Sequence, residues 1–337
     1  MMEVVVCAEP GVLVRDRRAR PVREAGQVLV RVRRAGMCGT DYHIYRGSQP
    51  YVAYPRIIGH ELAGEIVEGD EQGRFVPGAT VCIMPYLSCG SCVACRQGKT
   101  NCCTRIEVLG VHRDGGLAEY LAVDARFVVD AGGLSLDQAA MVEFLSIGRH
   151  AVERAQVSTG QKVLVAGAGP IGMAVTLFAA RRGAEVTVLD GNRARAAFCA
   201  DVLGARHHIA LDAATHDGLS RASGGDWFDV VFDATGSAAA IEAGFAYVAH
   251  GGSYVLVSVV PNEIRFSDPD FHRREMTLLG SRNATLSDFA AVIEVIRAGE
   301  VPTEAMHTHS GPLAELPGLM KDWMAPEAGV IKAIVEI

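Results

Sequence analysis

The sequence predicts an α/β protein of two domains, a β-rich domain followed by a doubly wound parallel sheet. Short runs rich in Val and Ile fill much of the first 147 residues, as expected for strands. From Gly148 to Gly280, strand-like and helix-like segments alternate, which is typical of a parallel sheet covered by helices. A glycine-rich turn joins the first strand of this region to its first helix. With 337 residues, of which 49% are hydrophobic, the chain can fill both cores.

In the β-rich region, strands are expected where Val- and Ile-rich runs are bounded by Gly, Pro or Asp, at 4–8, 27–33, 62–68 and 80–84. The Cys and His motifs lie between these runs. We therefore expect them on loops, where functional residues concentrate. Short basic stretches at 15–18 and 31–34 are expected on solvated faces. The domain is predicted to span residues 1–147.

In the alternating region, strands are predicted at 162–166, 185–189, 229–233, 253–259 and 276–279. Helices are predicted from the glycine-rich turn through Arg182, at 192–203 and, beyond the sheet, at 287–298. We place this second domain at 148–280. Residues 281–337 are expected to return to the first domain through a final strand at 330–337.

Charge and hydropathy restrict the classes of partner. The net charge of −7, from 32 basic and 39 acidic residues, gives no electrostatic case for nucleic acid. Residues 163–180 carry no charge, at the lower length limit for a membrane span. Three glycines and a proline interrupt that run, so a buried strand, a turn and a packed helix explain it better. The N-terminus has no secretion-signal pattern, and a cytoplasmic location is expected.

Four cysteines within fifteen residues follow the pattern C-x2-C-x2-C-x7-C: Cys89, Cys92, Cys95 and Cys103. Four thiolates fill every position of a tetrahedral zinc ion, so this pattern predicts a closed, structural zinc site in a lobe at about 86–104. Cys102 is the alternative fourth ligand. A disulfide framework is disfavoured because the chain is not a small secreted scaffold. Apolar surroundings predict that Cys7, Cys82 and Cys199 are buried.

A second, open zinc site is predicted from Cys38 and His60, with Glu61 or Glu143 as the third ligand. Three protein ligands leave one position for a substrate hydroxyl. Zinc lowers the pKa of a hydroxyl that it binds, which allows the adjacent C–H to pass hydride to a nicotinamide.

The proton of that hydroxyl must also leave the site. Thr40 and His43 follow Cys38 closely and are the candidates for its relay, because an imidazole exchanges protons near neutral pH. Asp41 is the candidate to orient a ligand imidazole.

The glycine-rich turn has the pattern G-x-G-x-x-G, carried by Gly167, Gly169, Pro170, Ile171 and Gly172. Between a strand and a helix, this pattern favours binding of a dinucleotide, with its phosphates at the helix N-terminus. Further coenzyme candidates lie at or just beyond the carboxyl ends of the next strands: Asp190, Arg195, Thr235, Val257 and Val259. The carboxylate after the second strand favours NAD over NADP because it repels a 2′-phosphate, although the following arginines could weaken that preference.

Together these motifs resemble the zinc-dependent medium-chain alcohol dehydrogenase family over essentially the whole chain. The resemblance lies in C-G-T-D-Y-H at 38–43, G-H-E at 59–61, the four-cysteine lobe, G-G-L-A-E-Y at 115–120 and the nucleotide turn. It implies a GroES-like catalytic domain, a Rossmann coenzyme domain, two zinc ions, NAD and a homodimer or homotetramer. It also supports Thr40 and His43 as the relay. The polyol branch carries V-E-P where this chain has Phe144 after Glu143, so both glutamates stay candidates.

Within that family, the chain looks most like hexonate 5-dehydrogenases, on the segments at 111–116, 266–272 and 280–285. This resemblance implies oxidation of L-galactonate or L-gulonate at C5. Arg282 is the candidate anchor for the substrate carboxylate, with His112 and Arg113 as alternatives. Two other functions stay open: a dehydrogenase of a neutral polyol, secondary alcohol or L-threonine, and a zinc-stabilised protein that binds a nucleotide without turnover.

Overall fold

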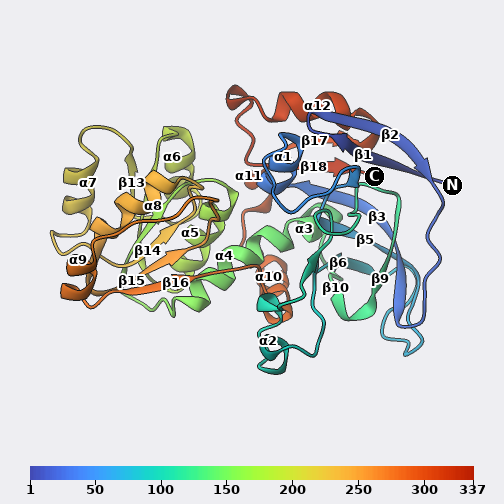
Figure 1. The fold of residues 1–337 in the computed structure, drawn as a ribbon, viewed down its shortest axis with the longest axis horizontal. Coiled ribbons are helices and arrows are strands. Elements are labelled where there is room, and N and C mark those ends of the chain that lie inside the picture. Colours follow the sequence, from blue (N-terminus) through green and yellow to red (C-terminus); the bar gives the residue numbers. More distant parts are fainter. The chain divides into compact units, whose positions relative to one another are not determined.

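The computed structural model describes residues 1–337 as two compact units, which are described separately (Figure 1). The first contains residues 1–144 and 284–337, and the second contains residues 145–283. The sequence placed the corresponding boundaries at 147/148 and 280/281. All nine cysteines are free thiols, and Cys7, Cys82 and Cys199 are buried as expected. None of the helices has the length and apolar character needed to cross a bilayer.

The first unit is built on a seven-stranded sheet in the order β10-β6-β5-β3-β18-β17, with β9 also paired to β3. Its strands are β3 (Gln27–Met37), β5 (Glu61–Glu68), β6 (Thr80–Ile83), β9 (Tyr120–Asp124), β10 (Val128–Asp130), β17 (His307–Pro312) and β18 (Lys332–Glu336). A second sheet, in the order β2-β1-β4, contains β1 (Met2–Glu9), β2 (Val12–Arg18) and β4 (Arg56–Ile57). Because β18 pairs antiparallel with β3, residues near the C-terminus lie beside residues 33–37 (Figure 1).

Short helices and turns complete this unit. The helices are α1 (Gly39–Tyr45), α2 (Val93–Arg96), α3 (Leu136–Ala140), α10 (Leu286–Arg297), α11 (Thr303–Met306) and α12 (Leu316–Trp323). The antiparallel strands β7 (Tyr86–Leu87) and β8 (Glu107–Val108) pair at the base of the four-cysteine lobe. Turns of 3-10 helix lie at Thr100–Cys102, Ala125–Phe127, Leu313–Glu315 and Pro326–Ala328. α10 begins where Asp288 accepts a hydrogen bond from the Thr285 backbone at 2.9 Å. The unit boundary at residue 144 lies within α4 (Val142–Arg154).

The second unit is a parallel six-stranded sheet in the order β13-β12-β11-β14-β15-β16. Its strands are β11 (Lys162–Ala166), β12 (Glu185–Asp190), β13 (His207–Ala210), β14 (Phe228–Asp233), β15 (Val248–Leu256) and β16 (Thr277–Gly280). Its other helices are α5 (Pro170–Arg181), α6 (Arg193–Asp201), α7 (Thr215–Ala222), α8 (Ala238–Gly244) and α9 (Asp268–Arg273), with a 3-10 turn at Phe245–Tyr247. From β11 the strands follow in chain order toward one edge of the sheet, through β12 to β13, and from β14 toward the other edge, through β15 to β16. The predicted doubly wound sheet is therefore confirmed.

Two expectations were wrong. The motif after Cys38 was expected on a loop, yet Thr40 and His43 lie on α1. The helix forms because the Asp41 carboxylate accepts a hydrogen bond from the Cys38 backbone N–H at 3.0 Å and so caps the first turn. The strand expected at 253–259 begins earlier and ends at Leu256, beyond which the Ser258 hydroxyl donates to Asp233.

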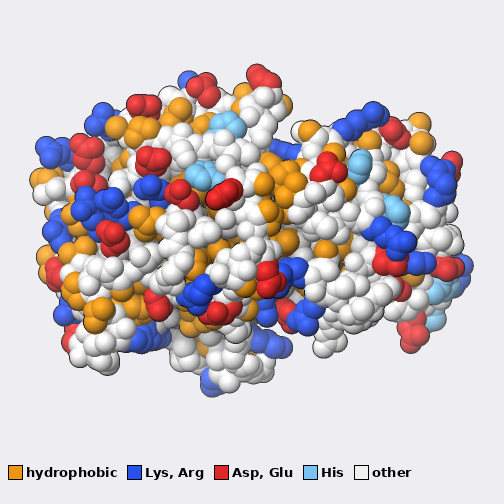
Figure 2. All heavy atoms as spheres, turned by 180° about the vertical axis from the view of Figure 1, so that it is seen from behind, with side chains coloured by type: hydrophobic (Ala, Val, Ile, Leu, Met, Phe, Trp, Pro, Cys, Tyr) orange, Lys and Arg blue, Asp and Glu red, His pale blue; other side chains and the backbone are white.

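Charge on the surface follows the composition. Figure 2 shows Lys and Arg side chains interspersed with Asp and Glu over the face that it draws, without a continuous basic stripe.

Candidate zinc and coenzyme sites

The four-cysteine lobe has the dimensions of a zinc site. The sulfur atoms of Cys89, Cys92, Cys95 and Cys103 all lie within 4.8 Å of one another. Two of the separations are 4.0 Å, between Cys89 and Cys95, and 3.4 Å, between Cys92 and Cys95. Four sulfurs bound to one zinc ion at about 2.3 Å would lie about 3.8 Å apart. The residues therefore fit a closed tetrahedral site.

Hydrogen bonds prepare these thiols for a metal. The Ser91 backbone N–H and the Arg105 guanidinium lower the pKa of Cys89 to about 5. Backbone N–H groups likewise lower the pKa of Cys92 to about 6. Cys103 is buried and its sulfur accepts a backbone N–H at 3.3 Å from Cys89, whereas the neighbouring Cys102 is exposed and outside the cluster. Desolvation and hydrogen bonds with Cys92 and Cys103 raise the pKa of Cys95 to about 11. Because the thiolate is the form that binds zinc, Cys89 and Cys92 are ready to bind at neutral pH, whereas Cys95 would lose its proton to the incoming metal.

The second donor cluster joins Cys38, His60 and Glu61, whose donor atoms also lie within 4.8 Å of one another. Cys38 precedes α1, His60 immediately precedes β5, and Glu61 is the first residue of β5. Gly59, immediately before them, has φ 94°, and an added Cβ would lie 3.1 Å from Leu117. Glycine adopts this conformation readily and other residues do not. The backbone turn at Gly59 therefore sets the direction of the chain at His60 and Glu61.

Asp41 connects the two ligand segments. Its buried carboxylate accepts hydrogen bonds from the backbone N–H of Cys38 at 3.0 Å and of Gly59 at 3.1 Å. The same carboxylate lies 3.6 Å from Nδ1 of His60, which is buried without a hydrogen-bond partner. Burial alone would lower the pKa of His60, but Asp41 and the Cys38 thiolate hold it well above its ordinary value. A half-buried cysteine sulfur, a buried imidazole and a buried carboxylate, with donor atoms this close together, fit a catalytic zinc ion.

The two candidate glutamates have different partners. Both carboxylate oxygens of Glu61 accept hydrogen bonds from Nζ of Lys332, at 2.7 and 2.6 Å. This ammonium also donates to the Met37 carbonyl at 3.2 Å and lies 4.4 Å from the centre of the Phe144 ring. Lys332 is 1% exposed, so the ion pair is fully buried.

Glu143 lies in the first turn of α4, where it accepts a hydrogen bond from the buried Tyr86 hydroxyl. Burial, together with the negative charge of Glu61, raises the pKa of Glu143 to about 7. The structure thus brings Glu61 into the donor cluster and leaves Glu143 outside it. Lys332 and Tyr86 were not anticipated. A lysine within the apolar run 330–337 was the available signal, because lysine is buried only with a partner.

The relay candidates occupy α1. Thr40 and His43 are three residues apart on this helix, which places them on one face. Nδ1 of His43 lies 3.0 Å from the Ser48 hydroxyl oxygen. The same hydroxyl donates a hydrogen bond to the His43 backbone carbonyl at 3.3 Å. Ser48 is therefore a further residue of this group that sequence reasoning missed.

The nucleotide turn has the expected close approaches. Gly167 has φ 96°, and a Cβ there would lie 2.7 Å from Ala234; a Cβ on Gly172 would overlap the Gly167 carbonyl. Around Gly169 there is open space, and this residue is the N-cap of α5, with Pro170 and Ile171 in the first turn. A bare helix N-terminus with space before it suits a phosphate.

The other coenzyme candidates lie at the carboxyl ends of parallel strands, which share one edge of the sheet. Asp190 ends β12 and accepts hydrogen bonds from the backbone of Ala168 at 2.5 Å and of Asn192 at 2.6 Å. Thr235 follows β14, where its hydroxyl donates to Asp233 at 2.6 Å. Three further residues complete the set: Val257 and Val259 follow β15, and Arg195 lies on α6. Arg193, the first residue of α6, lies 3.6 Å from Asp212.

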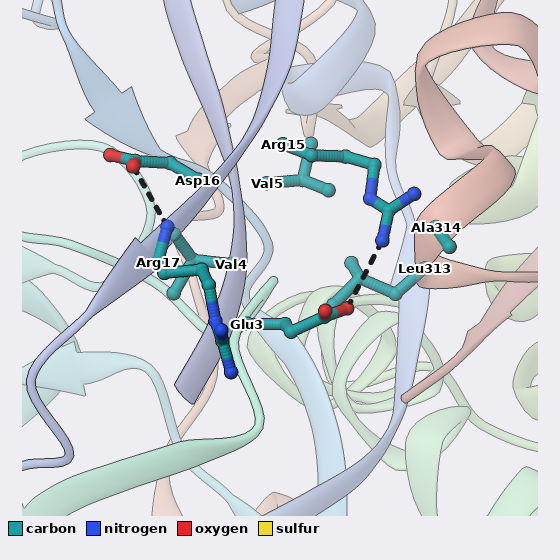
Figure 3. A pocket seen from close by; sticks show the side chains of 8 residues that line it. All are labelled: Glu3, Val4, Val5, Arg15, Asp16, Arg17, Leu313 and Ala314. Atoms are coloured by element: carbon teal, nitrogen blue, oxygen red, sulfur yellow. Dashed lines mark hydrogen bonds and ion pairs between the residues drawn. The ribbon is translucent and has the colours of Figure 1, made fainter. Parts of the chain in front are cut away.

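The candidate substrate residues lie in different units. His112 is exposed in the first unit, after β8, and exposed Arg282 follows β16 in the second. A separate cavity of about 270 Å³ lies against β1 and β2 and contains no candidate residue. Figure 3 shows its Arg15 and Glu3 side chains directed toward each other, at 3.4 Å.

Comparisons with known proteins cover both units. Residues 24–133 match the alcohol dehydrogenase GroES-like domain, and residues 170–298 match the zinc-binding dehydrogenase family. The chain is 40% identical to L-galactonate-5-dehydrogenase of Escherichia coli K12, over 94% of this chain and 93% of the relative. It is 32% identical to 2-dehydro-3-deoxy-L-galactonate 5-dehydrogenase of Pseudoalteromonas atlantica, over 93% and 92%. The crystal structure of the alcohol dehydrogenase RspB of Escherichia coli CFT073, solved with NADH, superposes with a TM-score of 0.93 at 28% identity, covering 100% and 99% of the two chains.

Proposed function

Because the chain belongs to the zinc-binding alcohol dehydrogenase family, we propose that it oxidises the C5 hydroxyl of an L-hexonate, L-galactonate or L-gulonate, with NAD as the hydride acceptor. The observation that carries this proposal is the 40% identity, over nearly the whole length of both chains, to an enzyme named for L-galactonate and position 5. A second relative is also named for a sugar acid and the same position. The product would be the 5-keto acid and NADH.

We assign the catalytic zinc to Cys38, His60 and Glu61, with Glu143 as the alternative third ligand. Bound there, zinc would make a substrate hydroxyl acidic enough for its carbon to lose hydride. Asp41 holds the two ligand segments together through Cys38 and Gly59. Lys332 balances the charge of Glu61. A second zinc ion is assigned to the four-cysteine lobe.

The proton of the substrate hydroxyl is assigned to Thr40 and then His43. Ser48 donates its hydroxyl hydrogen to the His43 carbonyl, so its oxygen is left to accept from Nδ1–H. In that tautomer Nε2 has the free lone pair. The imidazole can then accept a proton at Nε2.

The coenzyme is assigned to the carboxyl edge of the second unit's sheet. The open N-terminus of α5 is suited to the pyrophosphate, and the Asp190 carboxylate to a ribose hydroxyl. The Asp190 carboxylate supports NAD over NADP because it would repel a 2′-phosphate. A homodimer or homotetramer in a reducing compartment such as the cytoplasm completes the proposal; sedimentation velocity tests the assembly.

The test is a screen of coenzyme reduction with aldonates, alditols and amino alcohols, each with NAD and with NADP. We expect turnover of L-galactonate or L-gulonate with NAD. Cys38→Ala should abolish it, whereas the matched Cys102→Ala should not, because Cys102 is exposed and outside both clusters. Turnover of only neutral polyols or L-threonine would refute the sugar-acid assignment. Tight NAD binding without turnover of any alcohol would refute the enzyme assignment.

A further inference from the structure

Two segments of the first unit lie side by side next to the proposed zinc ligands. The backbone N–H groups of residues 115–117 donate to the carbonyls of residues 57–59, at 2.7 to 3.0 Å. A Cβ on Gly110 would lie 2.9 Å from the Gly59 backbone. Since His60 follows Gly59, the segment 108–117 is fixed against the start of the zinc site. The segment that carries His112 is therefore anchored to the backbone that immediately precedes His60.

The formal charges of these segments are already paired. Arg113 lies 3.6 Å from Glu107, and Arg56 lies 3.1 Å from Asp114. The Asp114 carboxylate also accepts the Ile57 backbone N–H at 3.2 Å. Arg113, a candidate anchor from the sequence, is thus directed to an acidic neighbour.

His112 has a different environment. Its Nδ1 accepts a hydrogen bond from the Val108 backbone N–H at 3.1 Å. A neutral imidazole that accepts at one nitrogen carries its hydrogen on the other, so Nε2 is a donor. The imidazole also stacks on the ring of Tyr51, with centroids 6.1 Å apart and an angle of 20° between the planes. Tyr51 is 65% exposed, so the two rings present an open apolar face with an N–H donor.

We infer that His112 and Tyr51 recognise the carboxylate-bearing end of the substrate. Nε2–H of His112 donates to a carboxylate oxygen, and the Tyr51 ring fixes the imidazole and contacts the carbon chain. This inference rests on the proposed function, since it requires a sugar acid. It separates acids from alditols, because an alditol has a neutral hydroxymethyl group where the acid has its carboxylate.

The experiment compares L-galactonate with galactitol, the same carbon chain with the carboxylate reduced. Calorimetry in the presence of NADH gives the Kd, and turnover gives the KM. His112→Phe keeps a ring on Tyr51 and removes the donor, so we expect L-galactonate to bind about tenfold more weakly while galactitol is unaffected. His112→Gln retains an N–H donor and should recover part of the loss. Tyr51→Ala should weaken both ligands, and Tyr51→Phe neither.

His208→Phe is the matched control, since it makes the same change at an exposed histidine, on β13. Zinc content and circular dichroism confirm that each variant is folded. An equal effect of His112→Phe on acid and alditol, or no effect, would overturn the inference even if the enzyme oxidises hexonates. If the wild type binds L-galactonate without oxidising it and His112→Phe weakens that binding, only the proposed function fails. If the wild type does not bind L-galactonate, the inference falls as well.

Discussion

Lys332→Met tests whether the buried Glu61 carboxylate needs the Lys332 ammonium for the protein to stay stably folded. The substitution keeps an unbranched side chain of similar length and removes the ammonium that binds both carboxylate oxygens, at 2.7 and 2.6 Å. Glu61 is 0% exposed, so its charge cannot turn to solvent for compensation. Removing one partner from a buried ion pair costs about 3–5 kcal/mol. That is a large part of the roughly 5–15 kcal/mol that stabilises a folded protein.

The cost should depend on the metal. In the zinc-free protein, Lys332 is the only cation in hydrogen-bond contact with Glu61, so the full penalty is expected there. Zinc bound at the site would supply a positive charge to the same carboxylate. We therefore expect the zinc-loaded variant to lose less stability than the zinc-free variant, and its affinity for zinc to rise by linkage.

Urea unfolding of wild type and variant, each zinc-free and zinc-loaded, measures these differences. Glu61→Gln in the Lys332→Met background provides the control, because a neutral amide has no charge left to compensate. The double variant should recover much of the lost stability, which defines a double-mutant cycle. A loss below about 1 kcal/mol in the zinc-free protein, far under the buried-pair range, would refute the reasoning. So would a double variant no more stable than Lys332→Met alone.

Other substitutions test the remaining sites. Arg105→Gln removes a hydrogen bond to the Cys89 thiolate and should weaken zinc binding by the lobe about 10- to 100-fold, measured by competition with a chromophoric chelator; unchanged affinity would contradict the assigned role. Asp190→Ser should raise the KM for NAD and lower the ratio of kcat/KM with NAD to kcat/KM with NADP at least about tenfold. An unchanged ratio would show that Asp190 does not set the coenzyme preference. Ser48→Ala should lower kcat on the order of tenfold, because no hydroxyl would then hold the proton of His43 on Nδ1. Ser48→Thr keeps the hydroxyl and should restore kcat. Equal kcat in wild type and both variants would show that Ser48 takes no part in the relay.

Local patterns predicted the parts of the structure that depend on neighbouring residues. The strand at 162–166, the turn at Gly167 and the helix after it follow from composition and spacing within about twenty residues. The cysteine spacing likewise anticipated a lobe whose sulfurs converge. The α1 helix was missed because its cap depends on a hydrogen bond that the Asp41 carboxylate accepts from the Cys38 backbone N–H.

Contacts between distant segments could not be read in the same way. Lys332 meets Glu61 across 271 positions, and Tyr86 meets Glu143 across 57. The first contact requires β18 to pair with β3, and β3 to pair with β5. A lysine in an apolar strand signals a buried partner, but it does not identify which carboxylate is that partner.

The position of Lys332 also sets an order of events during synthesis. Cys38, His60 and Glu61 leave the ribosome long before β18, so their loops exist first without the ammonium that balances Glu61. At about 5–20 residues per second, the delay is on the order of tens of seconds. During that interval Glu61 lacks the ammonium that pairs with it in the folded protein. β18, the last strand in the chain, therefore brings the ammonium that compensates Glu61 in the proposed active site. The first unit acquires this strand and its site acquires this charge in the same folding step.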